Sequence, residues 1–450
     1  MDQPAAVILA AGHGTRMKSA LPKVLHPLCG RPMLVYVLQA ARRAGVGRIL
    51  VVVSRDSGAI REAIGGGVDY VVQDPPRGTG DAVARALPRT RTGLAYVIYG
   101  DMPFVSVDTL RALRRAVGRT GAAALATRVV EQTRRFGRIV RDPAGRFARI
   151  VEDKDATSAE AAIREVNAGM YCVRVPEMHW ALRRVRPNNL QGEYYLTDAV
   201  NVLAAAGRDV ATVTVEDPDE MVGINTRGDL ADADAVLRRR ILRRLMLDGV
   251  TVVDPASTFV HEGVRIGRDT VLHPFTIVTG RSVIGPACEI GPGARLHNAV
   301  VGRGVRVRDS SLEECRLGDQ TAVGPYAHLR PGTVVGRHVE IGNYAEMKQV
   351  RVGDRTKVHH KSYLGDAWIG TDVNIGAGTI TCNYGLDRRK HRTTIGNGAY
   401  IGSDSMLVAP VRIGAGAATG AGSVVTKNVP ARGVAVGVPA RVIRRLAGRR

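Results

Sequence analysis

The sequence predicts two domains of different fold class: an α/β domain with a mostly parallel sheet, followed by a parallel β-helix of hexapeptide repeats. In the first two-fifths of the chain, short apolar runs typical of strands alternate with helical spacing. In the C-terminal half, an aliphatic residue recurs every six positions, a period that neither a helix nor an ordinary strand has. A stretch of helical spacing between the two halves predicts a connecting helical arm.

The first domain is predicted over residues 1–226. Its pattern predicts, in order, a strand at residues 5–9, a helix at 33–44, and strands at 49–53, 70–72 and 95–99. Ligands of such sheets bind beyond the C-terminal ends of the strands. Two chemically unusual segments, residues 10–17 and 100–103, each directly follow a strand. Both are therefore expected on one rim of the sheet.

The arm is predicted over residues 227–247, within a linker of residues 227–249, because its apolar residues have helical spacing and its aspartates precede its arginines. The β-helix is predicted over 250–450, with repeats from about residue 264 to 429. A strict period of six requires a corner after each short strand, where glycine or another small residue accepts the unusual dihedrals. The inward aliphatic positions include Leu317, Val323, Leu329, Val335, Ile341, Val352, Val358, Leu364, Ile369, Ile375, Ile395, Ile401, Leu407 and Ile413. No structure is predicted for the basic tail, residues 441–450.

Composition excludes several classes of protein. The five cysteines lack CxxC spacing, which argues against a zinc ribbon or a disulfide framework. No run of 18 apolar residues and no signal-peptide pattern occurs, so we expect a cytoplasmic protein without a membrane span. The net charge of +22 leaves a nucleic-acid-binding protein as an alternative, with strongly salt-dependent affinity and no turnover, but few aromatic residues are available to stack on bases.

A glycine-rich segment follows the first predicted strand, with the sequence LAAGHGTRM at residues 9–17. Its backbone N–H groups are free to face phosphate oxygens, and Arg16 and Lys23 add positive charge. A tight turn without a ligand is the alternative. The segment, with Pro22-Lys23 after it, resembles the signature of sugar-1-phosphate nucleotidyltransferases.

Further residues make the first domain similar to the uridylyltransferase half of the bifunctional N-acetylglucosamine-1-phosphate uridylyltransferase/glucosamine-1-phosphate N-acetyltransferase family. They are Gln73, Gly78, Thr79, Gly80, Tyr99, Gly100, Asp101, Met102, Pro103, Gly137, Glu152, Asn167, Gly223, Ile224 and Asn225. The resemblance implies a Rossmann-like domain that binds UTP and the uridylylated sugar product through Leu9, Ala10, Ala11, Gly12, Lys23, Gln73, Gly78, Thr79, Tyr99, Asp101, Gly137, Glu152, Asn167 and Asn225.

The resemblance also implies individual roles in that half. Asp101 and Asn225 would hold Mg²⁺, while Arg16 and Lys23 would stabilise the triphosphate during transfer. Gln73 and the Gly78-Thr79 backbone would read uracil, and the N-acetylglucosamine group would be held by Gly137, Glu152 and Asn167. By themselves, Asp101 equally fits a turn or helix cap, and Glu152 fits a solvated charge run.

Polar residues interrupt the hexapeptide pattern around Arg330, Lys348 and the doublet His359-His360. With 18 residues per coil, Arg330 and Lys348 fall on one face about 5 Å apart, where a sugar phosphate between them would relieve their repulsion. His360 falls on another face, which an adjoining subunit or a loop could bring into the same cleft. Acetyl transfer to an amine needs a base near neutral pH, and histidine suits that role, although a lone histidine is more often structural. The doublet leaves open which histidine acts.

These segments resemble the acetyltransferase half of the same family, in which the histidine of H-x-x-Y-L-G-D is the general base. The motif maps to His360, with Tyr363 following. The resemblance further implies a left-handed β-helix and a homotrimer. It implies glucosamine-1-phosphate ligands (Arg330, Lys348, Tyr363 and Asn374) and neighbours of acetyl-coenzyme A (Ala377, Asn383, Tyr384, Ser403 and Ala421). Two segments depart from the family pattern, Asn383-Tyr384-Gly385-Leu386 with Asp387 displaced, and residues 437–441.

The leading interpretation is an enzyme that acetylates glucosamine-1-phosphate with acetyl-coenzyme A and then transfers UMP from UTP to N-acetylglucosamine-1-phosphate. It would need Mg²⁺ and would bind neither nucleic acid nor membrane. Its product, UDP-N-acetylglucosamine, would supply cell-wall polymers. The alternative is a nucleotidyltransferase whose β-helix serves only assembly or regulation.

Overall fold

The computed structural model describes residues 3–12, 14–133 and 136–447, so His13 of the glycine-rich segment lies outside the described residues. The chain forms two compact units, Met1–Val236 and Leu237–Arg450. The division falls inside helix α8 (Arg227–Leu247), the helix that the spacing of apolar residues predicts. The division therefore falls within the segment predicted as the linker arm.

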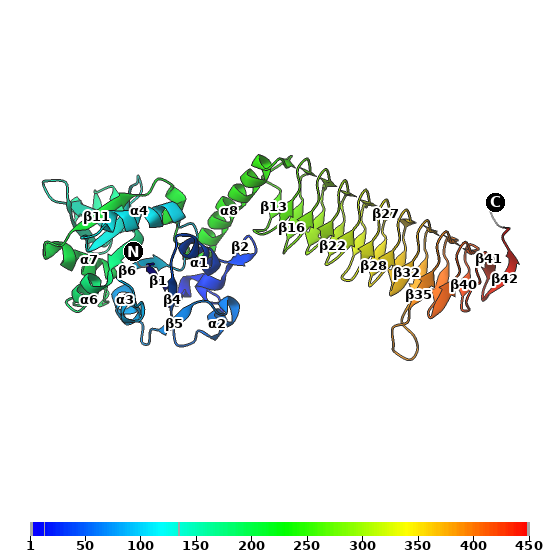
Figure 1. Cartoon of the computed structure of the whole chain (residues 1–450), viewed down its shortest axis with the longest axis horizontal. Helices are drawn as coiled ribbons and strands as arrows, with labels where there is room; N and C mark the ends of the chain where they lie inside the picture. Colours follow the sequence, from blue (N-terminus) through cyan, green and yellow to red (C-terminus); the bar gives the residue numbers. More distant parts are fainter. Residues whose placement is uncertain (1–2, 13, 134–135, 448–450) are drawn as a thin grey trace. The chain divides into compact units, whose positions relative to one another are not determined.

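The N-terminal unit is built on one sheet with the strand order β11-β7-β10-β6-β1-β4-β5 (Figure 1). Its strands are β1 (Ala5–Leu9), β4 (Arg48–Val53), β5 (Asp69–Val72), β6 (Leu94–Tyr99), β7 (Ala123–Val129), β10 (Glu165–Arg174) and β11 (Val210–Thr214). Strand β1 runs parallel to β4 and β6, whereas β10 is antiparallel to β6 and β7. The mostly parallel sheet is confirmed, with β10 as its antiparallel member.

A hairpin of β8 (Arg138–Arg141) and β9 (Phe147–Val151) extends from β10. The helices are α1 (Met33–Arg43), α2 (Gly58–Ile64), α3 (Thr79–Ala86), α4 (Val107–Val117), α5 (Ser158–Ala161), α6 (Val175–Leu182) and α7 (Leu196–Ala205). A two-stranded ribbon, β2 (Pro27–Leu28) and β3 (Arg31–Pro32), precedes α1. Leu50, Val97 and Tyr171 are fully buried in the core, so the central strands read as apolar runs.

The C-terminal unit is a parallel β-helix with three faces, each a sheet of short strands that pair with the next coil (Figure 1). Face 1 contains β12 (Thr251–Val252), β15 (Val271–Leu272), β18 (Glu289–Ile290), β21 (Arg306–Val307), β24 (Ala322–Val323), β27 (Glu340–Asn343), β30 (Lys357–His360), β33 (Asn374–Ile375), β36 (Tyr400–Ile401), β39 (Ala418–Thr419), β41 (Gly433–Gly437) and β42 (Ala440–Arg445).

Face 2 contains β13 (Phe259–Val260), β16 (Ile277–Thr279), β19 (Arg295–His297), β22 (Ser311–Glu313), β25 (His328–Leu329), β28 (Glu346–Lys348), β31 (Tyr363–Gly365), β34 (Ile380–Cys382), β37 (Met406–Val408) and β40 (Val424–Val425). Face 3 contains β14 (Arg265–Ile266), β17 (Val283–Ile284), β20 (Val300–Val301), β23 (Arg316–Leu317), β26 (Val334–Val335), β29 (Arg351–Val352), β32 (Ala367–Ile369), β35 (Thr393–Ile395) and β38 (Val411–Ile413).

The six-residue pattern points inward as predicted, because residues such as Leu329, Ile341 and Leu364 are buried in the array. Two expectations about the coils are wrong. A coil is not always 18 residues long: Arg303 and Asp319, hydrogen-bonded between adjacent coils, are 16 residues apart, and Arg337 and Asp354 are 17 apart. The corners also accept bulky residues in the left-handed region, such as Gln320 (φ 59°), so they do not depend on glycine or small residues.

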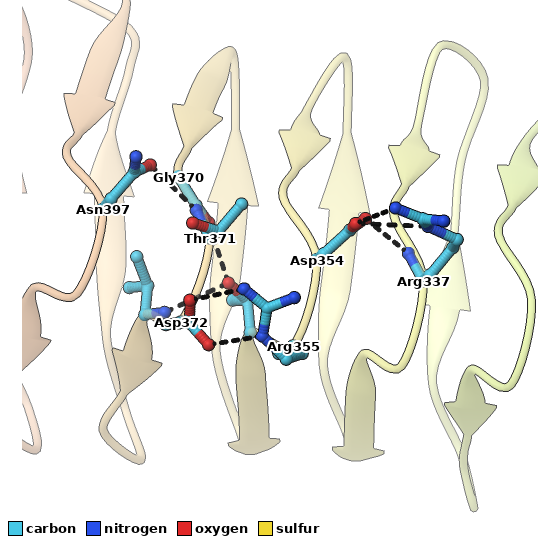
Figure 2. A network of polar contacts seen from close by, with 9 residues as sticks. Arg337, Asp354, Arg355, Gly370, Thr371, Asp372 and Asn397 are labelled. Carbon is cyan, nitrogen blue, oxygen red and sulfur yellow. Dashed lines mark hydrogen bonds and ion pairs between the residues drawn. The ribbon is translucent and has the colours of Figure 1, made fainter.

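Neighbouring coils are tied by polar side chains at the corner between faces 3 and 1 (Figure 2). Asp354 accepts hydrogen bonds from the backbone N–H of Arg337 at 2.8 Å and from its guanidinium at 2.9 Å. Arg355, in the same coil as Asp354, forms a two-pronged ion pair with Asp372 of the following coil, and each of the two bonds is 2.7 Å long. Asn397 continues the row by accepting from the N–H of Thr371 at 3.0 Å. The acceptor side chains of this row, Asp354, Asp372 and Asn397, therefore each fix the corner of the preceding coil.

The chain departs from regular coils in two places, at a loop between β34 and β35 and at the C-terminal hairpin. Between β34 and β35 the chain leaves the coil as a loop (Figure 1), and the flanking strands stay in register with their neighbours, β34 with β37 and β35 with β32. In the basic tail, for which no structure was predicted, strand β42 pairs antiparallel with β41. None of the five cysteines forms a disulfide (Cys29, Cys172, Cys288, Cys315 and Cys382). Among the residues described, no helix combines the length and apolar character needed to cross a membrane.

Candidate functional site

A cavity of about 410 Å³ lies at the C-terminal ends of strands β1 and β6 in the N-terminal unit, where parallel strands place ligands. Both unusual segments reach it, as predicted. Most of the implied nucleotide ligands line it, namely Leu9, Ala10, Ala11, Gly12, Lys23, Gln73, Gly78, Thr79, Tyr99 and Asp101. Pro76 and Glu193 also line it, although no sequence signal marks either residue.

The glycine-rich segment is folded closely against Lys23. Gly14 has φ 59°, in the left-handed region, and a Cβ there would lie 2.7 Å from the Cβ of Lys23. Gly14 therefore lets the segment curl against the lysine. At Gly12, in contrast, a Cβ would meet nothing within 4 Å, so the backbone of this residue is open to the cavity.

Four polar side chains converge at one end of the cavity. The Lys23 ammonium contacts a carboxylate oxygen of Asp101 and donates to Oδ1 of Asn225 at 3.2 Å. Arg16 donates to the same Asn225 oxygen at 2.9 Å. The N–H of Ile224 donates to the carbonyl of Asp101 at 3.0 Å, which fixes the two oxygen-bearing residues side by side. The arrangement joins segments more than 200 residues apart in sequence.

The positions of Asp101 and Asn225 suit a cation. Each presents an oxygen to the same positive group, the Lys23 ammonium, which acts as a stand-in cation between them. A carboxylate and an amide oxygen are hard ligands that leave most of an Mg²⁺ octahedron to water and phosphate. Among the described residues no group of three or more His, Cys, Asp or Glu side chains could hold a metal. A metal bound here would thus depend on its nucleotide for further ligands.

Gln73 organises the end of the cavity where the resemblance implies uracil binding. Its buried amide donates to the carbonyl of Gly78 and to Asp81, both at 2.9 Å. Gly78 lies against the backbone of Tyr194, and the hydroxyl of Thr79 accepts from the N–H of Leu196 at 3.0 Å. No sequence motif marks Asp81, yet its carboxylate accepts the hydrogen bond that fixes the orientation of the Gln73 amide.

The implied sugar ligands gather around Tyr99. Glu152 is close to Gly137, where a Cβ would lie 3.5 Å from its carboxylate, and the carbonyl of Gly137 accepts from the N–H of Asn167 at 2.8 Å. Burial raises the pKa of the Glu152 carboxyl, while the hydroxyl of Thr197, which donates to it at 2.8 Å, opposes that rise. Burial, with Glu152 and Asp101 nearby, also raises the pKa of Tyr99.

Glu152 is therefore a half-enclosed acceptor and not part of a solvated charge run. Thr197 is a further polar residue of this region. It lies in helix α7, whose sequence pattern does not mark it as a residue of the site.

In the C-terminal unit, Arg330 and Lys348 occupy equivalent positions on face 2, because His328 and Leu329 pair with Glu346 and Met347. Arg330 donates to the carboxylate of Glu346 at 2.7 Å. The Glu346 carboxylate thus offsets part of the repulsion between the two cations, and a sugar phosphate between them stays a prediction.

Tyr363 and Asn383 meet over Gly365, which is the register partner of Lys348. A Cβ on Gly365 would lie 2.6 Å from the Tyr363 hydroxyl and 2.6 Å from the Asn383 amide. Asn383 is buried and bonds the Asp366 carboxylate. Beyond it, the altered loop closes on itself: the N–H of His391 donates to the Asn383 carbonyl at 2.7 Å, Tyr384 bridges to Lys390, and Asp387 pairs with His391. The displaced Asp387 thus stabilises the loop internally.

The implied base and three implied neighbours of acetyl-coenzyme A form one column at the corner between faces 1 and 2. The column contains His360, Ala377, Ser403 and Ala421, which occupy equivalent places in successive coils. The carbonyls of the first three each accept a hydrogen bond from a backbone N–H of the next coil. The residues after His360 in the column are small, which leaves space along it for an extended ligand. Asn374 lies on face 1 in register with Lys357 and Tyr400, away from the Arg330 and Lys348 rows.

The two histidines of the doublet have different partners. The ring of His359 contacts the Glu340 carboxylate at 3.0 Å, whereas Nδ1 of His360 bonds Oδ1 of Asn343 at 2.6 Å. Within one chain, His360 lies on face 1, and Arg330, Lys348 and Tyr363 lie on face 2. The structure therefore separates the implied base from the implied phosphate ligands by a corner of the coil.

Comparisons with known proteins agree with this division of the chain. Residues 6–172 match the model of the MobA-like NTP transferase domain, residues 253–344 that of the GMPPB C-terminal domain, and residues 392–427 that of bacterial transferase hexapeptide repeats. These repeats and the three parallel faces describe a left-handed β-helix.

Relatives match along nearly the whole chain. The chain is 45% identical to the bifunctional protein GlmU of Heliobacterium modesticaldum over 97% of its own length and 96% of the relative's. It is 50% identical to that of Pelotomaculum thermopropionicum, over 90% of each chain, and 44% identical to that of Brevibacillus brevis, over 97% and 95%. The chain therefore belongs to the GlmU family of bifunctional enzymes, which join a uridylyltransferase and an acetyltransferase in one polypeptide.

Proposed function

We propose that the two activities are divided between the two units, with uridylyl transfer at the β1–β6 cavity and acetyl transfer along the corner column of the β-helix. The observation that supports this division is the gathering of each implied residue set within one unit. A spacer has no need to interrupt its repeats with Arg330, Lys348, His360 and Asn383, so the alternative of a non-catalytic β-helix is not favoured.

For uridylyl transfer, the phosphate oxygen of N-acetylglucosamine-1-phosphate attacks the α-phosphorus of UTP and pyrophosphate leaves. The open backbone at Gly12, with Arg16 and Lys23, neutralises the phosphates, so that attacker and leaving group stay in line. Gln73 and Thr79 hold uracil, while Glu152 and Asn167 hold the sugar. Mg²⁺ held by Asp101 and Asn225 supplies charge neutralisation when bound.

For acetyl transfer, the amine of glucosamine-1-phosphate attacks the thioester carbonyl of acetyl-coenzyme A and loses a proton, while the C–S bond breaks and coenzyme A leaves as its thiol. His360 accepts that proton, since it heads a column of small residues that suits an extended acyl donor. Arg330 and Lys348 hold the phosphate, and Tyr363 and Asn383 position the reacting groups over Gly365. Asn374 and Tyr384 are proposed ligands of the sugar phosphate and of the acetyl donor.

We further propose a homotrimer, in which His360 of one copy faces the Arg330 and Lys348 rows of another. The support is their separation by a coil corner within one chain, together with flat faces that favour side-by-side packing. The five free thiols fit the reducing cytoplasm, where the product would enter the synthesis of cell-wall polymers. The substrates are then small molecules, with no nucleic acid or membrane partner.

One experiment tests both assignments. The wild type, Asp101→Ala and His360→Ala are each supplied with glucosamine-1-phosphate, acetyl-coenzyme A, UTP and Mg²⁺. We expect UDP-N-acetylglucosamine from the wild type, and acetylated sugar phosphate without further conversion from Asp101→Ala. His360→Ala should form product only from added N-acetylglucosamine-1-phosphate. Normal acetylation by His360→Ala would remove the base assignment, and loss of both activities in Asp101→Ala would remove the division between units.

A further inference from the structure

Asn343 lies directly beside the proposed base. Strands β27 and β30 each have four residues, and their last residues, Asn343 and His360, are register partners. The other strands that precede this corner on face 1, from β12 to β39, have two. Their side chains meet, with Oδ1 of Asn343 2.6 Å from Nδ1 of His360. The extra length of both strands thus brings an amide oxygen to one nitrogen of the ring.

The backbone holds this contact in place. A Cβ on Gly342 would lie 1.9 Å from the carbonyl oxygen of His359, so the two strands approach closely just before the pair. The N–H of Lys361 donates to the carbonyl of Asn343 at 3.0 Å, which extends the corner column by one coil. Asn343 is half-buried and His360 exposed, so the ring keeps its other edge toward solvent.

The chemistry of the pair fixes which nitrogen carries hydrogen. An amide oxygen only accepts, so the bonded Nδ1 of His360 must donate, and the lone pair of the neutral ring then lies on Nε2. We propose that Asn343 is a positioning residue that holds His360 in the tautomer and orientation needed to accept the ammonium proton at Nε2. This inference rests on the proposed role of His360 as base.

The neighbouring histidine supplies a matched control. His359 contacts the carboxylate of Glu340, which also pairs with Lys357. Thus each histidine of the doublet bonds one polar residue of the preceding coil, 17 or 19 positions earlier. The ring of His359 lies edge-on to that of His360, with centroids 5.9 Å apart. The titratable and charged groups next to His360 are therefore His359, Glu340 through His359, and Lys361.

The test measures acetyl transfer against pH in Asn343→Leu, Asn343→Asp and Glu340→Gln, with uridylyl transfer by the same samples as the folding control. Leucine keeps the size of asparagine but accepts no hydrogen bond. We expect Asn343→Leu to lower kcat by about 10- to 100-fold with KM changed less than about twofold, since groups that orient a ligating or catalytic histidine have effects of this size.

Aspartate restores an acceptor and adds negative charge, which favours the imidazolium. Asn343→Asp should therefore recover most of the kcat at high pH and move the acidic limb of the pH profile to higher pH. Glu340→Gln should keep the wild-type kcat, because it alters the contacts of His359 and Lys357 and leaves the Asn343–His360 pair intact.

Two results would overturn the inference while leaving the base assignment intact. One is a wild-type kcat and pH profile in Asn343→Leu, and the other is an equal loss in Asn343→Leu and Asn343→Asp without a shift of the profile, which marks a merely structural residue. A loss in Glu340→Gln that matches Asn343→Leu would favour His359 and contradict the pairing. Parallel measurement of His360→Ala separates the two hypotheses: if that variant acetylates normally, the proposed base itself is wrong.

Discussion

Replacing Gly365 with alanine tests the acetyl-transfer site with a single methyl group. The new Cβ would lie 2.6 Å from both the Tyr363 hydroxyl and the Asn383 amide, whereas ordinary contact begins near 3.4 Å. Both side chains must therefore move by about 0.8 Å, and a misplacement near 1 Å costs up to about 100-fold in rate. We expect kcat for acetyl transfer to fall about 10- to 100-fold.

Folding should be affected far less, because the atoms that must move are the ends of two side chains and Gly365 needs no left-handed conformation. We expect the free energy of unfolding to change by less than about 1 kcal/mol. Gly353→Ala is the matched control, since its Cβ would lie 2.6 Å from the backbone of Gly370, at the corner between faces 3 and 1 and away from Tyr363 and Asn383. That variant should lose about 1–3 kcal/mol of stability and keep the kcat of its folded fraction.

Acetyl transfer is followed as release of the coenzyme A thiol, uridylyl transfer as release of pyrophosphate, and stability as thermal unfolding by circular dichroism. Wild-type acetyl transfer in Gly365→Ala would refute the placement of Tyr363 and Asn383 at the reacting groups. Loss of uridylyl transfer as well would show general misfolding instead of a local effect.

Three further predictions concern the cation site, the coil corners and the core. Without nucleotide, Lys23→Met should bind Mn²⁺ more tightly than the wild type, because the ammonium no longer occupies the oxygens of Asp101 and Asn225. Mn²⁺ binding is measured by electron paramagnetic resonance, and equal affinity in the two proteins would contradict this competition. The variant should still lose uridylyl transfer. Hydrogen bonds from Arg337 lower the pKa of Asp354, and hydrogen bonds from Arg355 lower the pKa of Asp372. Both carboxylates therefore stabilise the β-helix above about pH 4, and this stabilisation is lost as the pH falls through their lowered pKa values in the folded state. Thermal unfolding at decreasing pH should show a smaller acid loss in Asp354→Asn/Asp372→Asn than in the wild type, and an unchanged loss would show that other groups control it. Met347→Ala should lower the free energy of unfolding by about 2–5 kcal/mol in guanidinium titrations, because Met347 is fully buried, whereas Val334→Ala at a partly exposed position should have a much smaller effect.

The fold was predictable to the extent that its signals are local. The apolar runs that form β1, β4 and β6 are short and largely buried, and the six-residue period directly reflects one inward residue on each face. The direction of β10 has no such signal, because an antiparallel strand in the middle of a parallel sheet has the same composition as its neighbours and is fixed by long-range pairing. The length of each coil could not be predicted from the sequence either, because one residue more or less at a corner leaves the pattern of inward aliphatic residues intact.

The site was predictable where resemblance supplied long-range information. Spacing alone placed Arg330 and Lys348 on one face, and the structure confirms that placement. The meeting of Lys23 with Asn225, 202 residues away, has no local trace in the sequence. Asn343 was missed because the repeat pattern marks inward aliphatic positions and says nothing of a polar residue that extends a strand toward the next coil.

Strand β42 has a consequence for how the protein behaves in concentrated solution. A parallel stack of coils ends in a row of unpaired backbone donors and acceptors, which would template the addition of another chain. At the C-terminal end of face 1 the chain folds back and covers that row with an antiparallel strand carrying Arg441, Arg444 and Arg445. A further parallel coil cannot continue in register on such a strand, and the exposed charges repel like copies. On face 1 the terminal hairpin thus opposes the end-to-end addition of another β-helix.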